Sequence, residues 1–99
     1  MVRALNAHEE IRRVQVALTT VNMLVTTPPM VSPRVTPEFM KGVSAGYKMI
    51  GLILSLTSIR KLRGELEVGA AKMTDSSERE SGTLAAYNIV IVYLERMGF

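Results

Sequence analysis

Residues 36–59 read TPEFMKGVSAGYKMIGLILSLTSI, and this stretch decides the fold. Thr36 is a favourable helix N-cap, Pro37 suits the first helical position, and Glu38 complements the positive end of the helix dipole. After these residues, apolar side chains recur on nearly every side of a helical wheel, which is typical of a helix that is buried all round. The sequence therefore predicts a long buried helix over about 37–62.

Two glycines lie one turn apart within this helix. Gly42 and Gly46 remove side chains from one helical edge, which lets the backbone of a second helix approach closely. Each glycine costs up to about 1 kcal/mol relative to alanine in a helix interior, and a close crossing would offset that cost. We therefore expect Gly42 and Gly46 to lie at a helix–helix contact, within the chain or between copies of it.

The end of the buried helix carries a basic turn. This turn consists of Arg60, Lys61 and Arg63. Gly64 follows it, and basic residues followed by glycine are typical of a helix C-terminus. Because further apolar residues follow, we expect a break near Gly64 or Gly69 and a short helix over about 65–73.

A proline-rich segment precedes the buried helix. Residues 26–36 read TTPPMVSPRVT, and Pro37 comes directly after them. Each proline removes an amide donor and disfavours helix at the residue before it. The segment is predicted to be a stiff, extended or polyproline-like linker, serving either as a plain connector or as a docking arm.

The residues before the linker predict a first helix over about 7–25. Asn6 and Glu9 form a capping-box pattern at its expected start. An apolar stripe with spacings of three and four residues follows, made of Ile11, Val14, Leu18, Val21 and Val25. Arg12 and Arg13 lie off this stripe.

The C-terminal part predicts a last helix over about 77–97. Ser77 and Glu80 form a second capping-box pattern within the polar stretch 74–81. Two apolar rows follow, one made of Leu84, Tyr87, Ile91 and Leu94, and the other of Val90, Tyr93 and Met97. Two rows imply two packing partners, so we expect these residues to form helix–helix contacts, one of them with another subunit.

These segments together predict an all-α domain, a small up-down bundle of three long helices and one short helix. The chain has 99 residues, of which 47% are hydrophobic, and no cysteine. A domain this small has little interior in which to bury so many apolar groups. Because a contiguous exposed apolar face usually marks an interface, the chain is expected to form an oligomer.

The net charge of +3 and the distribution of cations suggest a basic track. If Val25 and Pro37 lie at one end of an antiparallel helix pair, Lys48 falls beside Arg12 and Arg13. The same pairing brings the N-terminus beside residues 60–63. The candidate residues are Arg3, Arg12, Arg13, Lys48, Arg60, Lys61 and Arg63. Spaced cations suit a nucleic-acid backbone without sequence specificity, although they also serve to solubilise a helical surface and to pair with glutamates.

Residues for catalysis or metal binding are scarce. The chain has one histidine, His8, and one aspartate, Asp75. The pairs Glu65/Glu67 and Glu78/Glu80 are two residues apart and do not share a helical face. We expect no enzymatic activity, no cofactor and no metal site.

Two features bear on location. The apolar stretch 42–59 is nearly long enough to span a bilayer, but Lys48 lies within it, so membrane association is not expected. The N-terminus lacks the order of a secretory signal, which predicts a location inside the cell or within a particle.

The composition and the predicted helices favour a structural or scaffolding subunit that packs against copies of itself. A viral coat protein and a small helical subunit of a ribonucleoprotein complex both fit that description. One alternative is an adaptor or inhibitor that covers a partner protein with an apolar helix face. A second alternative is a membrane-associated helical protein.

Overall fold

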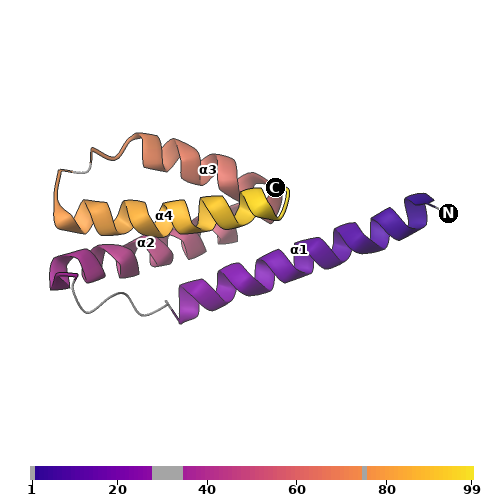
Figure 1. Ribbon diagram of the computed structural model, residues 1–99, viewed down its shortest axis with the longest axis horizontal. Helices are drawn as coiled ribbons and strands as arrows, with labels where there is room; N and C mark the ends of the chain where they lie inside the picture. The colour runs from indigo at the N-terminus through magenta and orange to yellow at the C-terminus, as the bar shows by residue number, and fades with distance from the viewer. Residues whose placement is uncertain (1, 28–34, 75) are drawn as a thin grey trace.

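The chain is all-helical, which confirms the predicted fold class. In this computed structural model, residues 2–27, 35–74 and 76–99 are described, with side chains from Ala7 onward, and no strand occurs in those ranges. The helices are α1 (Val2–Thr26), α2 (Pro37–Leu56), α3 (Ile59–Ala71) and α4 (Glu78–Arg96) (Figure 1). With 13 residues, α3 is the short helix.

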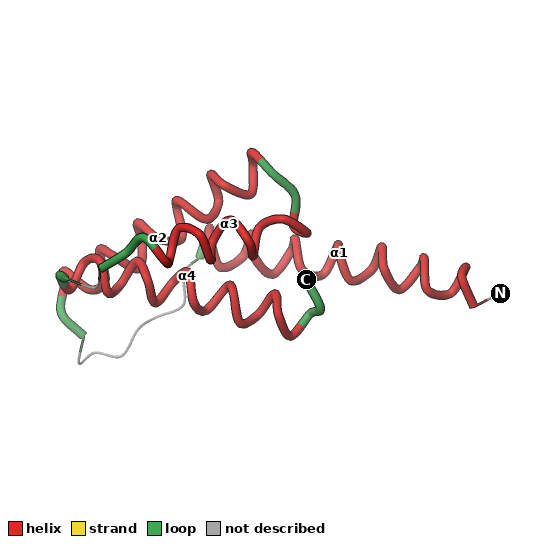
Figure 2. Tube along the Cα trace, turned by 90° about the horizontal axis from the view of Figure 1, so that it is seen from above, coloured by secondary structure: helices red, strands yellow, loops and turns green. Residues whose placement is uncertain are grey.

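The helices α2 and α4 lie side by side, run in the same direction and form the centre of the molecule (Figure 1). In the same view, α3 covers one side of this pair and α1 lies on the other side. Figure 2 shows that α1 extends beyond the other three helices toward its N-terminus. The molecule is therefore elongated, with dimensions of 53 × 26 × 21 Å.

The central pair crosses at direct backbone contact. A Cβ atom added to Gly42 would overlap the carbonyl oxygen of Arg79, and one added to Gly82 would overlap the carbonyl oxygen of Phe39. No other residue type fits at either position without moving a helix, because every other side chain begins with a Cβ atom. The close crossing expected at Gly42 is therefore found inside one chain.

The second glycine of the predicted pair lies one turn further along the same crossing. A Cβ atom on Gly46 would lie 2.8 Å from the Cβ atom of Ala86. Thr83 adds a hydrogen bond between the helices, because its Oγ1 donates to the carbonyl oxygen of Gly42 at 2.9 Å. Small residues and one hydroxyl thus hold α2 and α4 together.

The two central helices are related by an internal repeat that the sequence analysis missed. Gly82 lies 40 residues after Gly42, and the same shift relates four further identical pairs: Glu38 and Glu78, Ala45 and Ala85, Tyr47 and Tyr87, and Leu54 and Leu94. The contacts repeat as well, since Gly42 faces Arg79 and Gly82 faces Phe39, which are also 40 residues apart. Several of the remaining pairs differ even in polarity, such as Phe39 and Arg79 or Leu56 and Arg96, which hid the repeat.

The N-termini of both central helices are capped as predicted. Thr36 accepts a hydrogen bond from the backbone N–H of Phe39 at 3.2 Å, and Ser77 accepts one from Glu80 at 3.1 Å. Thr36 Oγ1 also donates to a carboxylate oxygen of Glu78 at 2.7 Å. The two caps therefore anchor the starts of α2 and α4 to each other, and α4 agrees with its predicted range to within one residue at each end.

The break after α2 lies earlier than predicted. We expected a helix to about residue 62 and a short helix over 65–73, but α2 ends at Leu56 and Gly64 lies in the middle of α3. Thr57 and Ser58 have extended backbone conformations between the two helices. The turn lets α3 run back along α4 and bury Leu62, which a continuous helix would carry away from the core.

The first helix also differs from its predicted range of 7–25. It begins at Val2, so Asn6 and Glu9 lie inside α1 and do not cap it. Arg3, Ala4 and Leu5 are good helix formers, which explains why the helix begins earlier than predicted. The extended conformation predicted for the linker falls mainly on residues 28–34, which lie outside the described residues.

The core lies between the central pair and its two covers. The largest fully buried side chains are Val21, Tyr47, Ile50, Leu62, Leu66, Val90 and Leu94. The prediction that the second helix is buried all round is wrong. Leu52 and Leu56 are 53% and 79% exposed, and Met49 is also exposed, because the small faces of α2 and α4 form the contact between them and leave this side uncovered.

Replacement by alanine should have opposite effects on stability at a glycine in the close crossing and at a glycine with open space around it. Gly42→Ala should lower the free energy of unfolding by about 1–3 kcal/mol or more, because the new methyl group overlaps the Arg79 carbonyl. Gly64→Ala is the control, since nothing lies within 4 Å of its Cβ position and alanine favours helix by up to about 1 kcal/mol. Urea denaturation measures both. Equal stability of the two variants would contradict the close crossing.

A buried hydroxyl gives a second prediction about stability. Tyr47 is fully buried, its Oη has no hydrogen-bond partner in the described structure, and burial raises its pKa. Tyr47→Phe should raise the free energy of unfolding by about 1 kcal/mol, because it removes an unsatisfied polar group. Tyr87→Phe, at the equivalent position of α4, is the matched control, since that hydroxyl is not among the buried unpaired atoms. A Tyr47→Phe variant that is clearly less stable than the wild type would refute this account.

Candidate interaction surface

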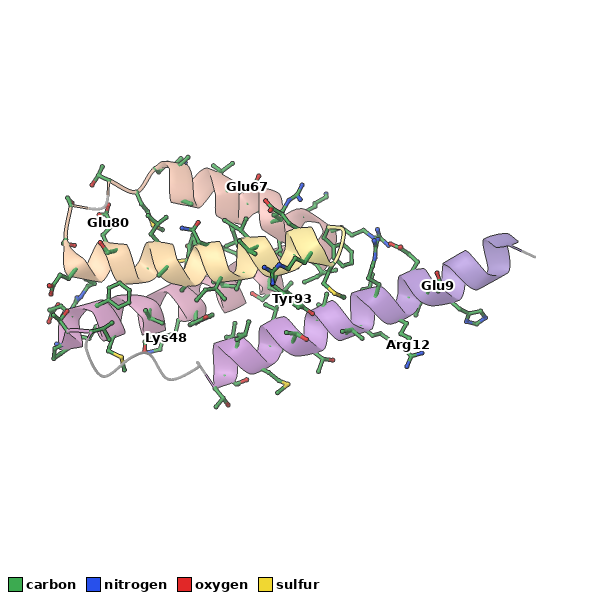
Figure 3. The ribbon with its side chains drawn as sticks, viewed as in Figure 1. Glu9, Arg12, Lys48, Glu67, Glu80 and Tyr93 are labelled. Carbon is green, nitrogen blue, oxygen red and sulfur yellow. The ribbon has the colours of Figure 1, made fainter. Side chains whose placement is uncertain are left out.

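The structure does not assemble the predicted basic track. Val25 packs on Gly51, where an added Cβ atom would lie 2.8 Å from Val25 Cγ1, so α1 is docked along the C-terminal half of α2 and not level with Pro37. Lys48 therefore lies near the C-terminal end of α1, well away from Arg12 (Figure 3). The predicted pairing of levels was wrong because it placed Val25 level with Pro37, whereas Val25 packs on Gly51, further along α2.

Two of the predicted cations instead meet at a carboxylate. Glu10 accepts from Arg13 at 2.8 Å and forms an ion pair with Arg60. The Arg13 guanidinium lies 4.5 Å from the centre of the Phe99 ring, and that of Arg60 lies 5.8 Å from it. The hydrogen bond from Arg13, followed by that from Arg60, holds the pKa of Glu10 below its usual value. This cluster fastens α1 to the start of α3 and to the C-terminal residues.

A glycine turn brings Phe99 into this cluster. Gly98 has a φ of +84°, a conformation that glycine adopts readily. Phe99 N donates to the carbonyl oxygen of Leu94 at 2.8 Å, and Gly98 N donates to that of Glu95 at 3.0 Å, which is the hydrogen-bond pattern of a Schellman motif. The sequence analysis missed this motif, although a glycine directly after a helix is its usual signal.

The other candidate cations are scattered. Arg63 Nε lies 3.6 Å from Glu67 Oε1, which is an ion pair within α3. Arg12, Lys48 and Lys61 are exposed and form no ion pair with a described side chain. The side chain of Arg3 lies outside the described residues. Three of the seven cations thus have carboxylate partners inside the chain.

The two apolar rows predicted on the last helix lie largely in the core of the chain. Tyr87, Val90, Ile91 and Leu94 are buried, and Leu84, Tyr93 and Met97 are partly buried. They form contacts between helices, but the buried residues are not accessible to another copy. The exposed large apolar residues of α4 are instead Ile89 and Val92.

Most of the exposed apolar residues of the central pair lie on two stripes at equivalent positions, and the α4 stripe ends in the charged Arg96. The α2 stripe consists of Ala45, Met49, Leu52 and Leu56, and the α4 stripe consists of Ala85, Ile89, Val92 and Arg96. Each has spacings of four, three and four residues, which is the spacing of a helix–helix seam. Ile89 and Val92 are 47% and 44% exposed and line an open groove of about 480 Å³ together with Asn88, Tyr93 and Arg96.

Three of the four glutamates that the sequence analysis considered for catalysis have structural partners. Glu67 pairs with Arg63, Glu78 accepts from Thr36, and Glu80 accepts from the Thr74 hydroxyl at 2.9 Å. His8 is exposed on α1. The described residues contain no group of three or more histidine or acidic side chains that could hold a metal ion.

Within the described part of the chain, no helix has the length and apolar character needed to cross a membrane.

Comparisons with protein-family models, with curated proteins and with solved structures found no match to this chain.

The Glu10 cluster predicts a specific dependence on pH. Because the pKa of Glu10 is lowered from 4.5 in the folded chain, its stabilisation is present above pH 4.5 and is lost as the pH falls through the lower folded value. The wild type should therefore lose more stability than Glu10→Gln between pH 5 and pH 3. Urea denaturation at several pH values measures this difference. Glu9→Gln is the control, and a pH profile of Glu10→Gln parallel to the wild type would rule out the role of Glu10.

Proposed function

We propose that this chain is a structural subunit that associates with copies of itself through the α2 and α4 stripes. The single observation that carries the proposal is the exposure of these aliphatic side chains, up to 79% at Leu56, along the two helices that also form the core. Large contiguous apolar surfaces on small soluble domains usually mark interfaces. Within each subunit, we interpret the four helices as an up-down bundle.

The accessible area supports this proposal. The chain exposes 6735 Å², whereas a compact monomer of its 10.9 kDa mass is expected to expose about 5,600 Å². The excess of roughly 1,100 Å² is comparable to the roughly 800 Å² that each partner contributes to a standard interface. Part of this excess comes from α1, which extends beyond the other helices (Figure 2).

Contact with a nucleic-acid backbone is the weaker part of this proposal. Arg13, Arg60 and Arg63 are engaged by carboxylates inside the chain, which reduces the charge available for phosphate. Such contact would depend mainly on Arg12, Lys48 and Lys61. We therefore base the proposed function on self-association alone.

Self-association should depend on both stripes. The wild type should sediment at multiples of 10.9 kDa that grow with concentration, and the double variant Leu52→Asp/Val92→Asp should sediment at 10.9 kDa. The introduced carboxylates would be buried without partners in an interface, whereas they are solvated in a monomer. Sedimentation velocity between micromolar and submillimolar concentrations measures both. Val16→Asp is the control, because Val16 is 44% exposed on α1 and belongs to neither stripe.

The alternatives give different results in the same experiment. A wild type that stays at 10.9 kDa at every concentration would overturn the proposal. A small closed dimer that does not grow would favour the adaptor, and a requirement for detergent would favour membrane association. Circular dichroism confirms that each variant remains helical.

A further inference from the structure

We propose that the copies associate head to tail, with the α4 stripe of one copy packed on the α2 stripe of the next, in an open-ended array. This inference rests on the proposed self-association and specifies its geometry. The occupant of each stripe is thus the other stripe of a second copy.

The orientation of the stripes is the first argument. On both helices the stripe lies about 90° around the axis from the glycine face, in the same rotational sense. The helices are parallel and their glycine faces meet at Gly42 and Gly82. Equal rotations on two parallel helices that face each other point to opposite sides of the pair. The α2 and α4 stripes therefore lie on opposite sides of the molecule.

The two covering helices are consistent with this arrangement. Val25 of α1 packs on Gly51, on the side of α2 away from its stripe. Gly69 of α3 packs on Tyr87, on the side of α4 away from its stripe. The α2 stripe thus lies on the α3 side of the molecule and the α4 stripe on the α1 side. Figure 1 shows that α3 and α1 lie on opposite sides of the central pair. Each central helix is covered on one side only.

Opposite faces determine the type of assembly. A translation of the chain, without rotation, brings the α2 stripe of one copy onto the α4 stripe of the next with the helices parallel. The contact is heterologous, because it joins two different surfaces, and a translation does not close into a ring. Each added copy presents the same free stripes as the first, so growth continues.

The shapes of the stripes are complementary. The α2 stripe presents long, flexible side chains, of which Leu56 protrudes most. The α4 stripe presents the shorter, β-branched Ile89 and Val92 along the groove of about 480 Å³. A row of protruding side chains fits a groove better than it fits a second row of the same kind.

Charge complementarity is the last argument. Glu95 lies beside the α4 stripe on the side away from α2, and it forms no ion pair with a described side chain. Because Gly69 packs on Tyr87 and α3 runs antiparallel to α4, Lys61 lies level with Glu95. In the array, α4 of one copy packs on the α2 stripe of the next and lies beside α3 of that copy, where Lys61 is close to Glu95.

Single substitutions distinguish this array from symmetric contacts. Leu52→Asp inactivates the α2 stripe and Val92→Asp inactivates the α4 stripe. In a head-to-tail array each variant alone should sediment at 10.9 kDa, because every contact needs both stripes. An equimolar mixture should form a dimer of about twice that mass and nothing larger, since one intact stripe of each kind remains. Val16→Asp should assemble like the wild type.

The outcomes separate this inference from the proposed function. If the wild type assembles but either single variant alone still forms a dimer, the contacts are symmetric and the head-to-tail array is overturned, while self-association stands. If the wild type stays monomeric, both fail. As a second test, Lys61→Glu and Glu95→Lys should each raise the concentration for half-assembly about threefold or more, and their equimolar mixture should restore part of the loss. Unchanged assembly in both charge variants would remove the Lys61–Glu95 contact and with it the assigned register.

Discussion

The backbone contact between α2 and α4 is the constraint on which the rest of the structure depends. At Gly42 and Gly82 each helix lies so close to the other that a Cβ atom would overlap a carbonyl oxygen. The contact uses the small faces of both helices, so their larger aliphatic side chains have to pack elsewhere. Tyr47, Ile50 and Val90 are buried in the core, whereas the large apolar side chains of the two stripes are exposed. The exposed apolar surface is therefore a consequence of the close crossing.

Local chemistry made several parts of the fold predictable. Thr36 and Ser77 cap their helices through their own side chains, so the starts of α2 and α4 could be read from the sequence. The break at residues 57–58 could not, because Ser58 makes no side-chain cap and the turn is favoured by burial of Leu62 and Leu66 under α4. Likewise, the linker sequence does not determine where α1 docks; the contact between Val25 and Gly51 does.

The candidate surface was harder to predict than the fold, for two physical reasons. Periodicity identifies an apolar helix face but does not tell which face the chain itself covers, so buried residues such as Leu94 were assigned to an outer contact while Val92 was overlooked. The cations depended on the relative positions of helices distant in sequence. Arg13 was expected off the apolar stripe of α1 and Arg60 in a basic turn, but Glu10 pairs with both of them instead of leaving them free for phosphate.

The same two helices form both the core and the proposed interface, so self-association of this kind would couple assembly to folding. Any partner that binds only the folded chain stabilises it by mass action, and this stabilisation grows with the logarithm of the partner's free concentration. Such coupling would increase the stability of the folded chain, because each neighbouring copy would cover a stripe of side chains that is otherwise exposed to water. The internal repeat has a related consequence for the proposed contact. The small faces of α2 and α4 contact each other, and the α2 and α4 stripes lie at equivalent positions on the outside of the pair. One chain therefore carries both surfaces of the proposed contact with the next copy.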